Sequence, residues 1–135
     1  YLKSRSSSKV LFVLPFTADD EINLPVNPAL FEWVIENVCK NGIDAMEGDG
    51  EITIKVEEEE KYAIIDISDT GKGLPKSSWK KIFSPGYTTK KRGWGLGLSL
   101  AKRIIEEYHH GRIFVKSSEP GKGTCIRIMM KTGIV

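Results

Sequence analysis

The sequence predicts an α+β domain: a two-layer α/β sandwich with a mixed, mostly antiparallel sheet of about five strands and about three helices on one face. Two observations favour this class. Strand-like segments come in pairs joined by short turns, which is typical of antiparallel hairpins. Long stretches with an apolar period near 3.6 residues separate these pairs, and such helices must pack against the sheet. The 135 residues are enough to form one core of this kind.

The N-terminal part begins with a polar, serine-rich stretch, residues 1–8, which we interpret as the remnant of a linker before a domain at 9–135. Residues 10–16 form an apolar run that predicts a buried strand, ended by Pro15 and Thr17. Residues 22–24 predict a short second strand. Because the chain opens on Tyr1 rather than Met, we expect it to be a fragment of a longer protein.

The first helix is expected to begin at Asn27 and Pro28, since Asn is a favoured N-cap and Pro is favoured at the first helical position. Apolar residues then recur with helical spacing until the segment Gly48-Asp49-Gly50, where the helix should end. These residues are Phe31, Val34, Ile35, Val38, Cys39, Ala45 and Met46.

Two hairpins are predicted on either side of a second helix. Residues 51–56 alternate between polar and apolar side chains, whereas residues 62–68 are apolar on both faces and should lie more centrally. The acidic run at residues 57–60 would form the solvated tip of this first hairpin. Residues 113–118 and 125–130 predict the second hairpin, around the turn at 119–123.

The second helix is predicted from Trp94 to His109, directly after a loop with three alternating glycines, Gly93, Gly95 and Gly97. Its apolar stripe is expected to include Leu98, Leu100, Ala101, Ile104, Ile105 and Tyr108. A glycine-rich loop before a helix presents free N–H groups that suit a phosphate. The same glycines would also fit a plain flexible turn before a core helix, so the loop alone leaves both interpretations open.

Composition and charge exclude several classes of function. The chain has neither a G-x-G-x-x-G dinucleotide fingerprint nor a P-loop string. Residues 76–92 carry six cations and no acid, beside the glycine loop, which favours a small anionic ligand over nucleic acid. The longest apolar run is too short to span a bilayer, so no membrane contact is expected. Cys39 and Cys125 resemble reduced core thiols, which fits a cytoplasmic protein.

Two polar clusters are candidates for ligand binding. Asn37 and Asn41 lie four residues apart, followed by Asp44, so the expected helix would carry them on one polar face. Amide oxygens there suit a ligand-bound Mg²⁺, although an ordinary solvated face would have the same pattern. Asp69, before Gly71 and Gly73, ends a predicted strand, where its carboxylate could accept a hydrogen bond from an exocyclic amine. A simple strand-terminating turn is the alternative.

Taken together and in order, these motifs resemble the ATP-binding catalytic domain of sensor histidine kinases, within the superfamily that includes gyrase and Hsp90. The resemblance covers nearly all of residues 9–131 and implies a Bergerat-type fold. The matching segments are residues 37–42 (N box), 69–73 (first glycine box), 83–90 (F box and lid), 93–98 and 121–124 (the remaining glycine boxes).

The resemblance implies a role for each matching residue. Asp69 would bind the adenine amino group, with Thr124 helping through water, while Asn41 would hold Mg²⁺ and Asn37 would orient the phosphates of ATP. Asn37, Asn41 and Lys90 would be catalytic, and Phe83 would anchor a mobile lid. The other implied nucleotide-binding residues are Gly71, Gly73, Thr88, Thr89, Arg92, Gly93, Gly95, Leu96, Gly97 and Leu98.

Two positions that depart from patterns within the superfamily indicate which activity to expect. Gyrase-like hydrolases carry a water-activating Glu at the position of Asn37, and an amide cannot act as that base. We therefore expect transfer of the γ-phosphoryl group to a histidine rather than hydrolysis. Many histidine kinases have a basic residue at the position of Asp44, so Lys90 would take over its contact with the phosphates.

The acceptor histidine is expected outside this chain. In the resembling family it lies in a separate dimerisation domain of the same full-length protein, and the phosphoryl group passes on to a response regulator receiver domain. His109 and His110 follow the glycine-loop helix and are expected to be capping or surface residues. A hydrolysing ATPase of the same superfamily and a non-catalytic nucleotide-sensing module remain the alternatives.

Overall fold

The computed structural model describes residues 10–13, 26–47, 49–86 and 97–132. Its elements are β1 (Val10–Val13), α2 (Pro28–Ala45), β2 (Gly50–Glu59), β3 (Tyr62–Asp69), the 3₁₀ helices η1 (Lys76–Ser78) and η2 (Lys81–Phe83), α3 (Gly97–Lys102), the π-helix η3 (Arg103–Tyr108), β4 (Arg112–Glu119) and β5 (Gly123–Lys131). The expected linker at 1–8, the strand at 22–24 and the end of the first strand lie outside the described residues.

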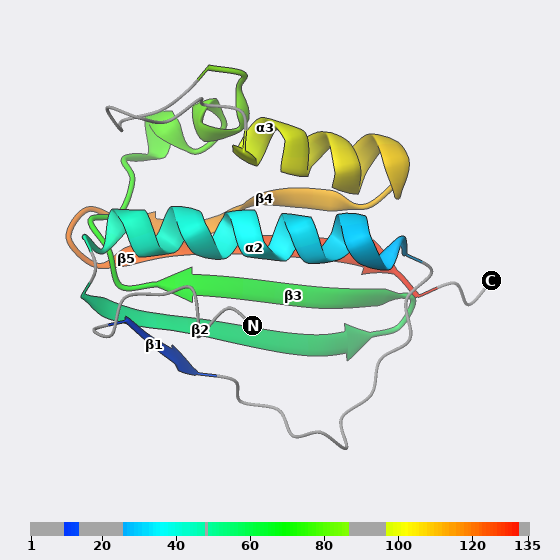
Figure 1. Cartoon of the computed structure of the whole chain (residues 1–135), viewed down its shortest axis with the longest axis horizontal. Helices are drawn as coiled ribbons and strands as arrows, with labels where there is room; N and C mark the ends of the chain where they lie inside the picture. The colour runs from blue at the N-terminus through cyan, green and yellow to red at the C-terminus, as the bar shows by residue number, and fades with distance from the viewer. Residues whose placement is uncertain (1–9, 14–25, 48, 87–96, 133–135) are drawn as a thin grey trace.

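A five-stranded sheet in the order β1-β2-β3-β5-β4 forms one layer, and α2 and α3 lie over it (Figure 1). β1 pairs with β2 in parallel, and the other neighbouring strands are antiparallel. Both predicted hairpins are present, and β3 is central, as its apolar sequence indicated. The predicted α+β class with a mixed, mostly antiparallel sheet is confirmed.

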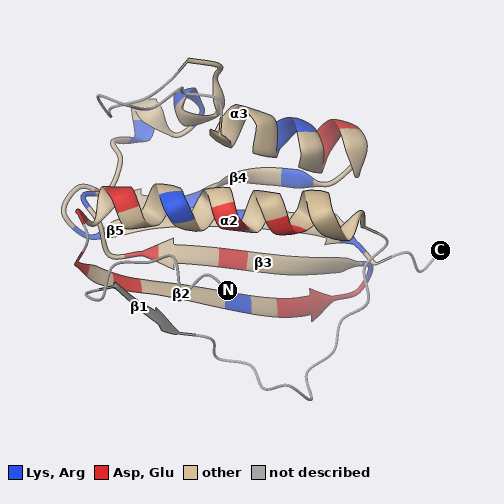
Figure 2. Cartoon of the chain, viewed as in Figure 1, with Lys and Arg blue, Asp and Glu red and all other residues tan. Residues whose placement is uncertain are grey.

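Alternation places the apolar side chains of β2 and β3 in the core. Ile52 and Ile54 of β2 and Ile65 and Ile67 of β3 are buried and belong to one cluster with Val38 of α2. The same cluster continues through Ala101 and Ile105 into β4 and β5. The acidic residues Glu57–Glu59 end β2 at the hairpin tip, where Figure 2 shows the red end of that strand.

The start of α2 agrees with the prediction. The Asn27 side chain accepts a hydrogen bond from the Leu30 N–H at 3.1 Å, and Pro28 occupies the first turn. The helix ends at Ala45, before the expected Gly48-Asp49-Gly50 segment. There the Ala45 carbonyl accepts a hydrogen bond from the Lys72 N–H at 3.1 Å, so a loop from β3 occupies the helix end.

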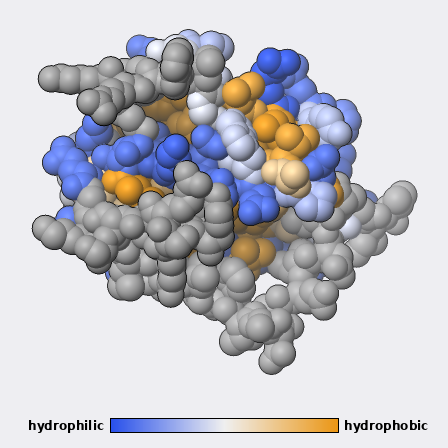
Figure 3. All heavy atoms as spheres, viewed as in Figure 1, coloured by the Kyte–Doolittle hydropathy of each residue, from blue (hydrophilic) through white to orange (hydrophobic). Residues whose placement is uncertain are grey.

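The prediction of one regular α-helix up to His109 is wrong in its C-terminal half, because η3 is a π-helix. Ala101 and Ile105 are buried as predicted, but Leu100 and Tyr108 are 37% and 61% exposed. A π-helical turn contains more residues than an α-turn, so Tyr108 rotates off the face that Ile105 presents to the sheet. Figure 3 shows apolar atoms at the surface in the region of α3.

Candidate functional site

The C-terminal half of α2 and the end of β3 approach each other closely at Gly42. A Cβ on Gly42 would lie 2.7 Å from Ile52 Cδ1 and 3.3 Å from Asp69 Oδ2. The Ile52 methyl could move aside, but the contact with Asp69 is tighter than ordinary van der Waals contact, so glycine favours this close packing. This packing places the predicted Asp69 against Gly42, whose neighbour in the chain is the half-buried Asn41.

Asp69 is held in one orientation by backbone donors. Its Oδ1 accepts hydrogen bonds from the N–H of Gly71 at 2.9 Å and from the N–H of Thr124 at 3.3 Å. Burial raises the pKa of Asp69 above its usual value, and these two hydrogen bonds oppose that rise. The arrangement occupies Oδ1 and leaves Oδ2 beside Gly42 as an oriented acceptor.

The loop after β3 and the β4–β5 turn pack backbone against backbone. A Cβ on Gly73 would lie 2.0 Å from the Glu119 carbonyl oxygen, and one on Gly123 would lie 2.0 Å from the Asp69 carbonyl oxygen. The Gly121 N–H also donates to the Lys72 carbonyl at 2.7 Å. The two glycine motifs predicted from distant parts of the sequence therefore form one wall of the site.

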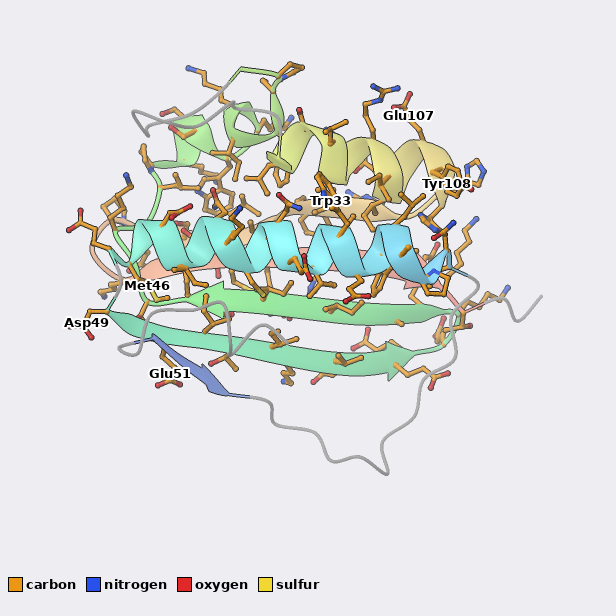
Figure 4. All side chains as sticks on the ribbon, viewed as in Figure 1. Trp33, Met46, Asp49, Glu51, Glu107 and Tyr108 are labelled. Carbon is orange, nitrogen blue, oxygen red and sulfur yellow. The ribbon has the colours of Figure 1, made fainter. Side chains whose placement is uncertain are left out.

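Asn37 lies on the neighbouring side of α2. Its Nδ2 donates to the Trp33 carbonyl at 2.8 Å, which leaves Oδ1 directed at α3, 3.1 Å from where a Cβ on Gly97 would stand. Figure 4 shows the Trp33 side chain between α2 and α3. The start of α3, including the half-buried Leu98, thus lies beside Asn37, as the predicted site requires.

Phe83 is fixed at the base of the predicted lid. It is buried in η2 as part of the core, and Lys102 Nζ of α3 lies 5.9 Å from its ring centroid. Seven predicted site residues lie outside the described residues, and their roles stay predictions. They are Thr88, Thr89, Lys90, Arg92, Gly93, Gly95 and Leu96.

A cation would have to bind together with its ligand. Among the residues that the structure describes, no three His, Cys, Asp or Glu side chains are grouped as a metal site. The half-buried Asn41 of α2 carries an amide oxygen, a ligand type that fits a Mg²⁺ that keeps water and phosphate ligands. In the described helices, none has both the length and the apolar character needed to cross a membrane.

Two residues of the site were given no role from the sequence: Gly42, which was named only as the end of the N-box segment, and Ser118. Gly42 is signalled by a glycine inside a helical pattern, which often marks close packing. Ser118 accepts from the Leu74 N–H at 2.7 Å and contacts Thr124 Oγ1 at 2.8 Å. No sequence signal identifies Ser118, because its place depends on a β-bulge between Val115 and Ser117.

Comparisons with known proteins agree with this geometry. The family described as histidine kinase-, DNA gyrase B- and HSP90-like ATPases matches residues 27–134. Sporulation kinase C of Bacillus subtilis (strain 168) is 39% identical over 97 residues, which are 72% of this chain and 22% of that protein. The chain thus spans less than a quarter of the length of that relative.

Solved structures show the same fold. The nucleotide-free catalytic domain of histidine kinase ThkA superposes with a TM-score of 0.80 at 28% identity, covering 92% of this chain and 80% of that one. ThkA in complex with the response regulator protein TrrA superposes with a TM-score of 0.76 at 26% identity, covering 91% and 34%. The chain belongs to the family of histidine kinase-, DNA gyrase B- and HSP90-like ATPases, as an ATPase domain of the sensor histidine kinase type.

Proposed function

We propose that the chain binds ATP together with Mg²⁺ and donates the γ-phosphoryl group to a histidine in a separate dimerisation domain of the same full-length protein. The observation that carries this proposal is the Asp69 carboxylate, with Oδ1 occupied by two backbone N–H groups and Oδ2 beside Gly42. A buried, oriented acceptor suits the exocyclic amine of adenine.

Base selectivity follows from the same carboxylate. Asp69 accepts a hydrogen bond from an amino group at the purine 6-position, whereas a 6-oxo group would place two acceptors against each other. An unpaired buried acceptor costs about 1–3 kcal/mol, and more if it is charged. Gly71 and Gly73 carry no side chains, so a flat ring can approach the loop after β3. The site therefore favours adenine over guanine nucleotides.

The triphosphate would extend from Asp69 along α2 toward the start of α3. Asn41 would contribute its amide oxygen to Mg²⁺, and Asn37 would orient the phosphates beside Gly97 and Leu98. Magnesium bound with the triphosphate would neutralise the negative charge that develops during transfer. Lys90, Arg92, Thr88 and Thr89 would close over the phosphates from the lid, and the backbone of Gly93, Gly95 and Leu96 would add N–H donors.

Transfer is favoured over hydrolysis because the α2 position that a general base would occupy is Asn37. An amide cannot accept a proton from water at neutral pH, so γ-phosphoryl transfer needs an acceptor delivered in line. ThkA forms a complex with a response regulator, which supports a receiver domain as the partner that takes the phosphoryl group onward. A cytoplasmic location would supply both ATP and that partner.

The test combines binding and transfer. The chain is titrated with ADP and with ATP, with and without Mg²⁺, and then incubated with γ-labelled ATP, alone and with the separately produced dimerisation domain. We expect micromolar-range binding, no label on the chain alone, and acid-labile label on the partner's histidine. Rapid phosphate release by the isolated chain would favour the hydrolase alternative, and tight binding with no transfer to the partner would favour a nucleotide sensor.

A further inference from the structure

We propose that Ser118 is a positioning residue: it fixes the direction of the Thr124 hydroxyl and so strengthens selection of a 6-amino purine over a 6-oxo purine. The inference rests on the proposed function, since it concerns the same nucleotide site. It extends that function to a residue that touches the nucleotide only through Thr124.

A β-bulge brings Ser118 to the site. Ile113 and Val115 of β4 are buried against the helices, and strict alternation would place Ser117 next on that face. The register shift between Val115 and Ser117 inserts one residue, so that Ser118 pairs with Thr124 instead. Bulges re-aim side chains in this way. Ser117 is left exposed.

Asp69 and Thr124 lie on the same face as Ser118. Asp69 continues the buried row of Ile65 and Ile67 in β3, and Thr124 continues the row of Ile126 and Ile128 in β5. The Thr124 N–H donates to Asp69 Oδ1 at 3.3 Å, and Thr124 as a residue is only 7% exposed. The three polar side chains thus lie at the same end of three adjacent strands, at the edge of the core.

Counting protons fixes the direction of each hydroxyl. Ser118 Oγ accepts from the Leu74 N–H at 2.7 Å and lies 3.1 Å from the Gly123 carbonyl, which can only accept. The single Ser118 proton is therefore used on Gly123. The contact of 2.8 Å between Ser118 Oγ and Thr124 Oγ1 then requires Thr124 to donate.

Thr124 Oγ1 consequently keeps its lone pairs for the ligand. The site then presents two acceptors, Asp69 Oδ2 and Thr124 Oγ1, and no hydroxyl proton in that direction. An adenine amine, or a water held beside it, can donate to both, whereas a guanine 6-oxo group can donate to neither. Without Ser118 the Thr124 hydroxyl would be free to rotate and donate to an oxo group.

The experiment compares ADP with GDP in variants of the chain. We expect Ser118→Ala to lower the ADP-over-GDP affinity ratio by about three- to tenfold, the worth of one neutral hydrogen bond. Ser117→Ala is the matched control and should leave the ratio unchanged. Ser118→Thr retains the hydroxyl and should restore most of the selectivity. The readout is calorimetric titration, with thermal melting of each apo variant alongside.

A double-mutant cycle with Thr124→Val separates positioning from general destabilisation. If Ser118 acts through Thr124, then Ser118→Ala should change the ratio no further in the Thr124→Val background. Additive effects on the ratio, or an unchanged ratio in Ser118→Ala, would overturn the inference. If Ser118→Ala fails to fold, Thr124→Val alone should lower the ADP-over-GDP affinity ratio. An unchanged ratio in Thr124→Val would then overturn the inference. Failure of the wild-type chain to bind ADP would instead refute the proposed function.

Discussion

The partly buried carboxylate of Asp69, which is the proposed adenine contact, destabilises the folded chain. Burial raises the pKa of Asp69, so its ionised form is less favourable in the folded chain than in the unfolded chain. That cost is present at neutral pH and disappears as the pH falls below the unfolded pKa. The two N–H donors of Gly71 and Thr124 reduce it but do not reverse its sign.

Asp69→Asn should therefore abolish nucleotide binding without lowering stability. The amide still accepts from Gly71 and Thr124, but it presents a donor to the adenine amine and loses a charge-assisted bond worth about 2 kcal/mol. We expect loss of ADP binding by calorimetry and an apo melting temperature at pH 7 no lower than that of the wild type. Asp49→Asn, at an exposed turn, is the control. Wild-type ADP affinity in a folded Asp69→Asn chain would remove Asp69 from the site.

The thiol of Cys39 should be inert in the folded chain. Burial is the main cause that raises its pKa to about 12, so almost no thiolate exists at pH 8. We expect alkylation of Cys39 by iodoacetamide only upon unfolding, as followed by mass spectrometry with the urea-unfolded chain as the positive control. Modification of the native chain at the rate of the unfolded one would contradict this environment.

At the scale of elements, His109 ties the end of the π-helix to the start of α2. Its Nδ1 lies 2.8 Å from the Ile104 carbonyl, and its Nε2 accepts from the Asn27 N–H at 3.0 Å. The two partners require a neutral ring with the proton on Nδ1, because a carbonyl only accepts and an N–H only donates. One side chain thus links the two helix ends, and the Ile104 carbonyl also accepts from the His109 backbone N–H at 3.1 Å.

His109→Ala should lower the free energy of unfolding by about 1 kcal/mol, since it leaves the Asn27 N–H without its partner, whereas the Ile104 carbonyl keeps its hydrogen bond from the backbone N–H of residue 109. Chemical denaturation measures the change. His110→Asn is the control, since His110 is exposed and has a positive φ of 58°, which Asn tolerates. Equal losses in the two variants would show that the link contributes nothing specific.

The sequence predicted most elements because their signals are local. Asn27 and Pro28 mark the start of α2, and alternation marks β2. The π-helix could not be predicted, because the short segment has no apolar pattern that distinguishes a π-turn from an α-turn. The α-helical period therefore places Tyr108 on the buried face, where the structure does not have it. In the site, motif matching identified Asp69 and Thr124, whereas Ser118 depends on a bulge that only the paired strands reveal.

For the molecule as a whole, an ion-pair network joins three strands on the face of the sheet away from the helices. Asp66 of β3 receives a bidentate contact from Arg127 of β5 at 2.8 and 2.9 Å, and Lys116 of β4 lies 3.4 Å away. The hydrogen bond from Arg127 is the main cause that lowers the pKa of Asp66. The sign is therefore opposite to that of Asp69: this stabilisation is present above the unfolded pKa and is lost as the pH falls.

Asp66→Asn should lower the free energy of unfolding by about 1–2 kcal/mol at pH 7, less than a buried pair because the network is partly solvated. The deficit should shrink toward pH 3, as the wild-type carboxylate becomes protonated. Urea denaturation across this range measures it, with Glu58→Gln at the exposed hairpin tip as the control. A deficit that stays constant with pH would point to packing rather than charge.

The strand order also determines the sequence of folding steps and which of them is slow. The two hairpins, β2–β3 and β4–β5, each join neighbouring segments and can close within microseconds. Their union along β3 and β5 brings together residues such as Asp66 and Arg127, which are 61 positions apart in the chain. The entropy of closing that loop is lost before any of its contacts form. Docking of one hairpin on the other is thus the expected rate-limiting step, and substitutions along this seam should slow folding more than those within either hairpin.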